Sequence, residues 1–443
     1  MKLAVVILAG CSSTLPRAPE CESLRSLALP HVSITSARVV DATYCRVDGI
    51  SRPTADSEIR FEVAIPLGSA WNGRYQQIGN GGFAGLVPED DLAAAVALGN
   101  ATAGTDDGHV SKRAINAEWA LGHPEKVIDF GYRAVKETHD VAIEIIRAYT
   151  GRAPRFQYFT GCSDGGREGL MEAQRYPGDF DGIVAGAPAN HATQLLTAMA
   201  WNELALDAAP ISLAKLPAIE HAALAACGKD GVIEDPLACH FDPAVLRCTG
   251  VETDACLTDA QVAALAKIYA GPGTSAGLEP GAEAEPGSWD AWIIDADPAQ
   301  LRFAQTFFRY MVFGDPTFDL HALRFDRDPG AKLRPLINSD DPDLHAFAAR
   351  GGKLLQFHGW NDQVIAPRDS IAYYNAVTAK LGDPSKFYRL FMIPGMLHCE
   401  GGRGPASLPT LDAIEAWVEA GRAPDQLNAP GWTLCPYPKH GRC

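Results

Sequence analysis

The chain has 443 residues, of which 47% are hydrophobic and 21% charged, a composition typical of globular proteins with a sizeable core. Its formal net charge is −16, which would repel a phosphate backbone, so nucleic acid is not an expected partner. Beyond the first residues no apolar run approaches the roughly 20 residues needed to span a bilayer. A membrane-spanning segment is therefore not expected.

The N-terminus has the pattern of an export signal. The stretch "MKLAVVILAGCSS" combines one lysine, a short apolar run and small residues, as secretion signals do. Within it, "LAGC" resembles the lipobox of bacterial lipoproteins, where cleavage before the cysteine is coupled to its lipidation. We predict a lipoprotein-type signal peptide at residues 1–10 and a lipid anchor at Cys11, which would be the only membrane attachment of a bacterial envelope protein. Plain secretion is the alternative.

Strand and helix patterns alternate over the next part of the chain. Residues 60–67 and 74–79 are predicted to be neighbouring strands joined by the turn-forming "GSAWNG". Residues 122–151 have apolar residues at helical spacing, a proline near the start and a glycine at the end, which predicts a helix. A β-rich run at 155–160 then leads through "GCSDGG" into a predicted helix that ends by Pro177, and residues 180–189 read as a buried strand.

The pattern changes between residues 190 and 343. This segment is rich in alanine, has closely spaced cysteines and contains "GPGTSAGLEPGAEAEPGSW", typical of an exposed loop. Strands at 352–359 and 386–393 and helices at 369–381 and 408–421 follow it. Such alternation predicts an α/β fold with a mostly parallel sheet, built from residues 11–189 and 344–443 and interrupted by an inserted lid domain at 190–343.

A candidate nucleophile lies in the turn "GCSDGG". Gly161, Ser163 and Gly165 fit G-x-S-x-G, the nucleophile elbow, in which the serine occupies a strained turn between a strand and a helix. Side chains on the flanking residues would collide with backbone there, which explains the glycines. A predicted strand and a predicted helix stand on the required sides. Ser163 is therefore the expected nucleophile, with Cys162 as the alternative.

A serine hydroxyl needs a base and an orienting carboxylate to become a good nucleophile. Open α/β sheets place such groups just past the carboxyl ends of their strands. Asp362 follows the predicted strand at 352–359, and His398 follows the one at 386–393. Each residue alone has a simpler structural interpretation, but the order Ser163, Asp362, His398 is that of α/β hydrolases. We predict that these three residues form a catalytic triad.

The cysteine count agrees with export. If one of the eleven cysteines takes a lipid, ten remain, and these can pair completely in an oxidising compartment. A zinc site is disfavoured because no C-x-x-C occurs. Cys162 precedes the expected nucleophile and Cys399 follows the expected base, so a folded triad brings their Cα atoms close. We predict a disulfide that ties these two loops together.

Three stretches, "GCSDGGREGLMEAQRYPGDFDGIVAGAPA", "HGWNDQVIAP" and "IPGMLHCEGG", resemble the tannase and feruloyl esterase family, which includes hydrolases of terephthalate half-esters. The resemblance extends through "QQIGNGGFAG", "TDDGHV" and "CLTDAQVAALAKIYAGP". It implies an α/β hydrolase with a lid, the same triad, and esterase activity on small aromatic esters without an organic cofactor. It also implies disulfides that pair Cys162 with Cys399, Cys21 with Cys45, Cys227 with Cys239, Cys248 with Cys256, and Cys435 with Cys443.

Further site residues follow from this resemblance. Two backbone N–H groups must face the developing oxyanion; one is expected from Asp164 and the other from Gly82, with Gly81 as the alternative. Phe83, Trp289 and Trp292 are candidates for stacking on an aromatic acyl group, although core packing is an equal alternative. The motif with Asp106, Asp107 and His109 is expected to form structural hydrogen bonds rather than to act in catalysis.

The lid departs from the family at its calcium loop. Family members commonly wrap one calcium ion with a repeated Asp and Gly pattern, of which "CGKDGVIEDPLAC" keeps only Asp230, Gly231 and Val232. Calcium takes about 6 to 8 oxygen ligands, so we expect neither a bound metal nor another cofactor. Cys227 and Cys239 would stabilise this loop instead.

The expected function is that of a serine esterase acting on feruloyl or other hydroxycinnamoyl esters. Galloyl esters and terephthalate half-esters are the alternatives. A rival of another class is a lipid-anchored binding protein without activity, built on the hydrolase fold. The sequence leaves the oligomeric state open.

Overall fold

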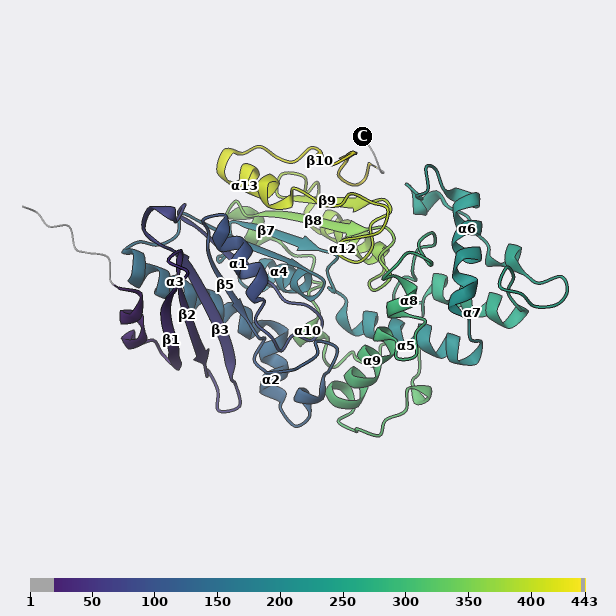
Figure 1. The fold of residues 1–443 in the computed structure, drawn as a ribbon, viewed down its shortest axis with the longest axis horizontal. Coiled ribbons are helices and arrows are strands. Elements are labelled where there is room, and N and C mark those ends of the chain that lie inside the picture. Colours follow the sequence, from purple (N-terminus) through teal and green to yellow (C-terminus); the bar gives the residue numbers. More distant parts are fainter. Residues whose placement is uncertain (1–19, 440–442) are drawn as a thin grey trace, which may run out of the picture.

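The computed structural model describes residues 20–439 and 443. At its centre lies a nine-stranded sheet in the order β1-β2-β3-β5-β4-β6-β7-β8-β9 (Figure 1). Along this order, the strands β1, β2, β3 and β5 pair antiparallel with one another. From β5 through β4 to β9, all neighbouring strands are parallel. The strands are β1 (Val32–Val40), β2 (Tyr44–Ser51), β3 (Ile59–Pro66), β4 (Arg74–Ile78), β5 (Ala101–Thr105), β6 (Phe156–Cys162), β7 (Gly182–Gly186), β8 (Lys353–Gly359) and β9 (Tyr388–Ile393). The predicted α/β-hydrolase fold with a mostly parallel sheet is confirmed.

One prediction about the sheet is wrong. The strands β3 and β4, expected to be neighbours, are separated by β5, which pairs antiparallel with β3 and parallel with β4. The sequence of β5, "ATAGT", has small residues and no hydrophobic alternation because the strand is buried throughout. It therefore lacks the pattern by which a half-buried strand is recognised.

Helices cover both faces of the sheet. Side chains of α1 (Glu89–Ala97) and α13 (Thr410–Ala420) pack on one face. Those of α3 (Ala134–Thr150), α4 (Asp164–Arg175) and α12 (Pro367–Leu381) pack on the other. The segment expected to be one helix at 122–151 consists of α2 (Pro124–Ile128), a π-helical turn at Asp129–Arg133, and α3. Gly151, directly after α3, has a left-handed backbone conformation that ends the helix.

The chain between β7 and β8 forms a separate group of helices. It contains α5 (Ala192–Ala208), α6 (Leu216–Cys227), α7 (Asp259–Ala270), α8 (Trp289–Trp292), α9 (Ala299–Thr306), α10 (Arg334–Ile337) and α11 (His345–Ala349). Figure 1 shows α6 and α7 at the end of the molecule opposite to β1. The limits predicted for the lid, 190 and 343, fall within this connection and stay a prediction.

Five disulfides cross-link the part of the chain that the structure describes: Cys21–Cys45, Cys162–Cys399, Cys227–Cys239, Cys248–Cys256 and Cys435–Cys443. They are the pairs that the family resemblance implies. The last one joins Cys435, directly after the hairpin of β10 (Leu427–Ala429) and β11 (Trp432–Leu434), to the C-terminal residue. The predicted signal peptide and Cys11 lie outside the described residues.

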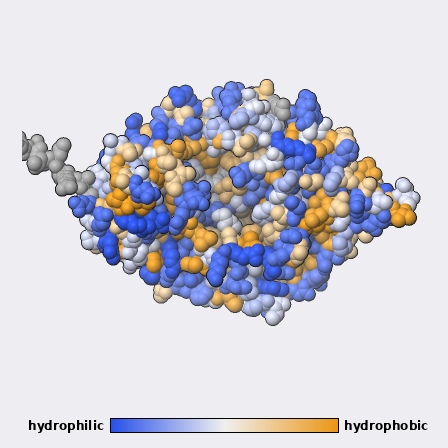
Figure 2. All heavy atoms as spheres, in the orientation of Figure 1, coloured by the Kyte–Doolittle hydropathy of each residue, from blue (hydrophilic) through white to orange (hydrophobic). Residues whose placement is uncertain are grey.

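The surface carries both hydrophilic and hydrophobic residues. On the face drawn in Figure 2, hydrophilic residues predominate and hydrophobic ones occur in small groups among them, as is ordinary for a protein surface. Within residues 20–439, no helix combines the length and the apolar character that crossing a membrane requires.

Candidate active site

Ser163 lies in a sharp turn between β6 and α4, with φ 65° and ψ −118°. Such positive φ values are uncommon for residues other than glycine and mark strained backbone. A Cβ atom on Gly161 would lie 2.6 Å from the backbone carbon of Gly165, and one on Gly165 would lie 3.0 Å from the carbonyl oxygen of Asn80. The two glycines therefore allow the close backbone contacts that this elbow requires.

The structure brings Ser163, His398 and Asp362 together. Nε2 of His398 lies 2.9 Å from Oγ of Ser163, and its Nδ1 lies 2.7 Å from Oδ2 of Asp362. The histidine comes from the loop after β9 and the aspartate from the loop after β8. This chain of hydrogen bonds is the arrangement by which an imidazole can remove a proton from a serine hydroxyl.

Asp362 is held by several donors. Its Oδ1 accepts hydrogen bonds from the N–H groups of Val364 and Ile365, at 2.8 and 2.9 Å. Nε2 of the fully buried His358 lies 3.1 Å from its Oδ2. Burial by itself raises the pKa of Asp362, but the two histidines beside it lower this pKa overall. The carboxylate is therefore ionised and can stabilise an imidazolium at His398.

The disulfide Cys162–Cys399 joins the residue before Ser163 to the residue after His398. The two Cα atoms lie 6.0 Å apart, and 237 positions separate the cysteines in the sequence. The bond links the elbow to a loop from the far part of the chain. It also uses the sulfur of Cys162, which is therefore no free thiol.

Two backbone N–H groups beside Ser163 are available to a ligand. Asp164 is the first residue of α4, and Gly82 lies in the loop after β4 with φ 60°. Both residues line the cavity that contains Ser163. Within the described part of the chain, neither N–H donates a backbone hydrogen bond. Gly82 has no room for a side chain, because a Cβ there would lie 2.6 Å from the carbonyl oxygen of Ala114.

Hydrogen bonds from α4 and β5 fix the loop that carries Gly82. Oε2 of Glu168 accepts the N–H of Asn80 at 2.9 Å, and the Asn80 side chain donates to the carbonyl of Thr105 at 2.9 Å. The N–H of Gly165 donates to the carbonyl of Asn80 at 2.7 Å. The glycine loop and the elbow are thus bonded directly to each other.

A buried charged cluster stands behind this loop, formed by Asp107, Asp164, Arg167 and Glu168. Arg167 has no exposed surface, and its guanidinium donates to both oxygens of Asp164, at 2.5 and 2.9 Å. It also donates to the carbonyls of Phe130 and Gly131. Burial and then the charge of Asp164 raise the pKa of Glu168 to about 8, and burial raises that of Asp107 well above its usual value.

Carboxylates could hold a metal ion at two places in the described residues: Asp107, Asp164 and Glu168, and His139, Asp140 and Asp179. In the first group Arg167 already supplies a buried positive charge. In the second, Nζ of Lys136 contacts Asp140 and Asp179 at 2.6 and 3.0 Å. Both groups thus have a side-chain cation, so neither composition calls for a metal.

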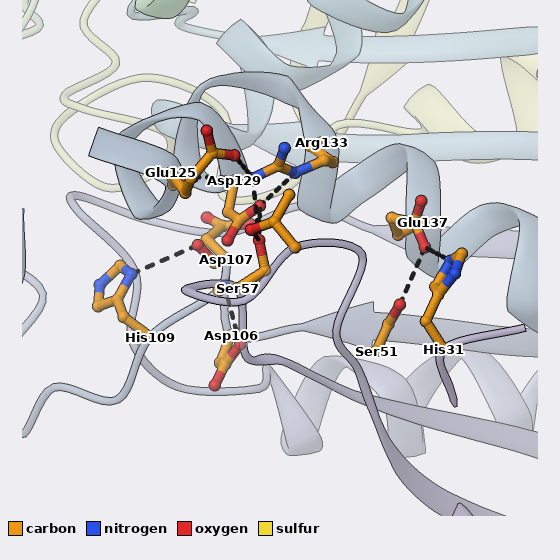
Figure 3. Close-up of polar contacts among 12 residues, drawn as sticks. His31, Ser51, Ser57, Asp106, Asp107, His109, Glu125, Asp129, Arg133 and Glu137 are labelled. Atoms are coloured by element: carbon orange, nitrogen blue, oxygen red, sulfur yellow. Dashed lines mark hydrogen bonds and ion pairs between the residues drawn. The ribbon is translucent and has the colours of Figure 1, made fainter. Parts of the chain in front are cut away.

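The neighbouring motif with Asp106 and His109 makes structural contacts (Figure 3). Asp106 accepts the N–H groups of Arg60 and Gly108, at 3.0 and 2.9 Å. The His109 ring stacks on Trp119 with centroids 3.8 Å apart. Burial lowers the pKa of His109 to about 3, so the ring is neutral at ordinary pH. These contacts order the turn behind the glycine loop.

A cavity of about 70 Å³ opens beside Ser163. Four aromatic side chains line it: Phe83, Phe130, Trp292 and Phe303. Phe83 packs edge-on against Phe303 with centroids 5.1 Å apart, and Trp292 lies parallel to Phe303 at 6.1 Å. The Trp292 ring is also 5.9 Å from that of His398. The cavity and the Ser163–His398 hydrogen bond are therefore parts of one site.

The residues predicted from the sequence to stack on an aromatic acyl group lie in different places. Phe83 and Trp292 line the cavity, whereas Trp289 does not. Trp289 is buried in the core of the inserted helices, 6.2 Å from the ring of Tyr269. Sequence reasoning missed Phe130 and Phe303, which have the same apolar, helical context as ordinary core residues. It also missed His358, a buried residue of β8.

The shortened lid loop does not fit a calcium ion. Asp230 is exposed, and the carbonyl of Val232 accepts the N–H of Lys229 at 2.8 Å. The carbonyl of Gly231 accepts a hydrogen bond from Arg403 at 3.0 Å, and the same guanidinium pairs with Glu220 and Glu285. The carbonyls of Gly231 and Val232 are thus already hydrogen-bonded within the protein, and the three residues kept from the calcium pattern offer fewer oxygens than the 6 to 8 that calcium takes.

Comparisons with known proteins agree with this geometry. Residues 45–434 match the family model described as tannase and feruloyl esterase. An uncharacterized esterase of Xanthomonas campestris pv. campestris is 39% identical over 96% of this chain and 89% of its own length. The mono(2-hydroxyethyl) terephthalate hydrolase of Piscinibacter sakaiensis is 30% identical over 90% of this chain and 82% of its own.

A solved structure is also similar. The crystal structure of feruloyl esterase B from Aspergillus oryzae superposes with a TM-score of 0.85 at 28% identity, covering 95% of each chain. The family match spans most of the chain and includes both parts of the sheet, the inserted helices and the residues around Ser163. The chain therefore belongs to the tannase and feruloyl esterase family and is a carboxylic-ester hydrolase.

Proposed function

We propose that this enzyme hydrolyses small aromatic acid esters through a Ser163-His398-Asp362 triad, with feruloyl and other hydroxycinnamoyl esters as the first candidates. One observation carries the proposal: the hydrogen-bonded chain from Asp362 to Ser163 ends in a cavity lined with aromatic side chains. A serine nucleophile and a site for an aromatic ring are the two features that such a reaction requires.

The reaction proceeds in two halves. Ser163 attacks the ester carbonyl while Nε2 of His398 takes its proton, and Asp362 stabilises the imidazolium. The N–H groups of Asp164 and Gly82 bind the oxyanion of the tetrahedral intermediate. His398 then returns the proton to the departing alcohol, and a water activated by the same nitrogen releases the acid. No metal or organic cofactor takes part.

Alternatives within the same chemistry are galloyl esters and terephthalate half-esters. A lipid-anchored binding protein without activity is disfavoured, because it has no need of the Ser163–His398 hydrogen bond. Catalysis by Cys162 is disfavoured because its sulfur is bonded to Cys399. We also infer export, since five disulfides are typical of oxidising compartments; lipidation of Cys11 remains part of that proposal.

A fluorophosphonate probe tests the nucleophile. We expect it to label the wild type but not Ser163→Ala. Ser385→Ala, which changes a partly exposed serine, is the control and should label normally. Equal labelling of Ser163→Ala and the wild type would refute the role of Ser163.

Hydrolysis of methyl ferulate, methyl gallate and mono(2-hydroxyethyl) terephthalate by enzyme that has not been exposed to the probe tests the substrate class. Turnover of at least one is expected, with activity lost in Ser163→Ala. No turnover of any of the three by protein that the probe labels would reject aromatic acid esters as substrates.

A further inference from the structure

The walls of the cavity beside Ser163 are almost wholly apolar. Apart from the nucleophile, the polar side chains among its lining residues are those of Asp164 and Trp292, the latter through its indole N–H. The carboxylate of Asp164 is bound on both oxygens by Arg167. Trp292 is half-buried, and its ring lies 5.9 Å from that of His398, so this residue belongs to the part of the cavity next to the triad.

The helices α5 and α10 contribute only aliphatic side chains and a methionine to the walls: Ala192, Leu195, Leu196, Met199 and Ile337. The buried amide of Asn190, close in the sequence, is not among the lining residues. A hydroxyl on an acyl ring in this cavity would thus meet no donor or acceptor from these helices.

The cavity is smaller than an aromatic ring requires. It measures about 70 Å³, less than half of the roughly 150 Å³ of an engineered apolar cavity that binds benzene. A ring can therefore enter only when the side chains of the walls move apart, and those side chains are apolar.

We propose, given the function proposed above, that this cavity selects aromatic acyl groups without hydroxyl or charged substituents on the ring. Unsubstituted cinnamoyl esters would be better substrates than feruloyl esters, which carry one ring hydroxyl. Galloyl esters, with three hydroxyls, would be worse. Terephthalate half-esters would be excluded as anions, because burying a carboxylate without a partner is prohibitive.

A series of methyl esters with one reacting bond tests this selection. Methyl 4-fluorocinnamate and methyl 4-hydroxycinnamate differ by a fluorine and a hydroxyl of similar size. Since an unpaired buried hydroxyl is costly, kcat/KM for the fluoro ester should exceed that for the hydroxy ester by at least about fivefold. Equal values, or a preference for the hydroxy ester, would overturn the proposal.

A variant of the wall makes the test sharper. Met199→Gln replaces a buried methionine of α5 by a hydrogen-bonding side chain of similar length. It should raise the ratio of kcat/KM for the hydroxy ester over the fluoro ester, whereas Met199→Leu should leave the ratio unchanged. An unchanged ratio in a Met199→Gln protein that the fluorophosphonate probe labels would count against the proposal.

Different results would contradict the proposed function and the selection by the cavity walls. Wild-type protein that the probe does not label, and that hydrolyses none of the esters, contradicts the proposed function. Wild-type protein that is labelled at Ser163 and prefers hydroxylated rings contradicts only the selection by the apolar walls. If Met199→Gln does not fold, the wild-type series still decides.

Discussion

Ser163 stands between two regions of opposite character. The cavity on one side is lined by aromatic and aliphatic side chains, while the charged cluster on the other side contains three carboxyl groups and one guanidinium, all buried. Asp164 belongs to both regions, because its backbone lines the cavity and its carboxylate binds Arg167. We infer that the cluster fixes the position of the backbone and that the cavity determines which acyl group fits.

The physical difference lies in how each region responds to change. Hydrogen bonds between buried ionised groups have defined directions and leave an unpaired charge when one partner is removed. Apolar contacts have no direction, and a trimmed apolar side chain leaves a void that its neighbours can partly fill. The charged side should therefore tolerate little change, and the apolar side should tolerate much more.

The largest effect is expected from Arg167→Met. This change removes the guanidinium that binds both oxygens of Asp164 and leaves that carboxylate buried without its counter-charge. The free energy of unfolding, measured by urea denaturation, should fall by about 3–5 kcal/mol.

Arg350→Met is the matched control for this change. Arg350 is partly exposed, and it pairs with Asp181 at 2.9 Å, so its removal should cost less than about 1 kcal/mol. Equal losses for the two variants would show that the buried cluster has no special role in stability.

A smaller effect concerns pH and the buried carboxyl group of Glu168. Its pKa is raised from 4.5 to about 8 in the folded protein, so the folded state binds this proton more tightly than the unfolded state does. The stability that this proton contributes is complete at pH values below 4.5 and decreases as the pH rises towards 8.

Glu168→Gln should flatten this decrease, because an amide does not titrate and its oxygen can still accept the N–H of Asn80. The measurement is the free energy of unfolding between pH 5 and pH 9. The exposed Glu144→Gln is the control and should keep the slope of the wild type. If Glu168→Gln keeps the same slope, the pH dependence does not come from the raised pKa of Glu168.

Sequence reasoning predicted the features that depend on short motifs and chain order. The α/β-hydrolase fold followed from alternating strands and helices. The proximity of Ser163, Asp362 and His398 followed because parallel strands bring their carboxyl ends to one edge of the sheet. The neighbourhood of Cys162 and Cys399 followed from the same geometry.

Features that depend on contacts between distant segments could not be predicted in this way. Phe130 comes from the region of α2 and α3 and Phe303 from α9, yet both face one cavity. Trp289 and Trp292 are three positions apart on one short helix, and only the packing of that helix decides which of them faces His398. Asp107 likewise reaches the cluster around Arg167 from the chain that follows β5, the strand that lacks a hydrophobic pattern.

The smallest effect on stability is expected from Phe303→Leu on the apolar side. Phe303 contacts Phe83 and Trp292 at the edge of the cavity, where a smaller side chain enlarges existing space. The free energy of unfolding should fall by only about 1 kcal/mol. The ratio of kcat/KM for methyl cinnamate to kcat/KM for methyl acetate should change, because the acyl ring loses its contact with the Phe303 side chain.

Phe347→Leu is the matched control for Phe303→Leu, because Phe347 is buried in the core under the sheet and lies 2.5 Å from where a Cβ of Gly352 would be. Phe347 does not line the cavity beside Ser163, so the same change should cost more there, about 2–3 kcal/mol. If the two variants lose equal stability, the cavity wall is packed as tightly as the sheet core. Its side chains would then fix the geometry of the site as strictly as the charged cluster does, and the division of roles on the two sides of Ser163 would not hold.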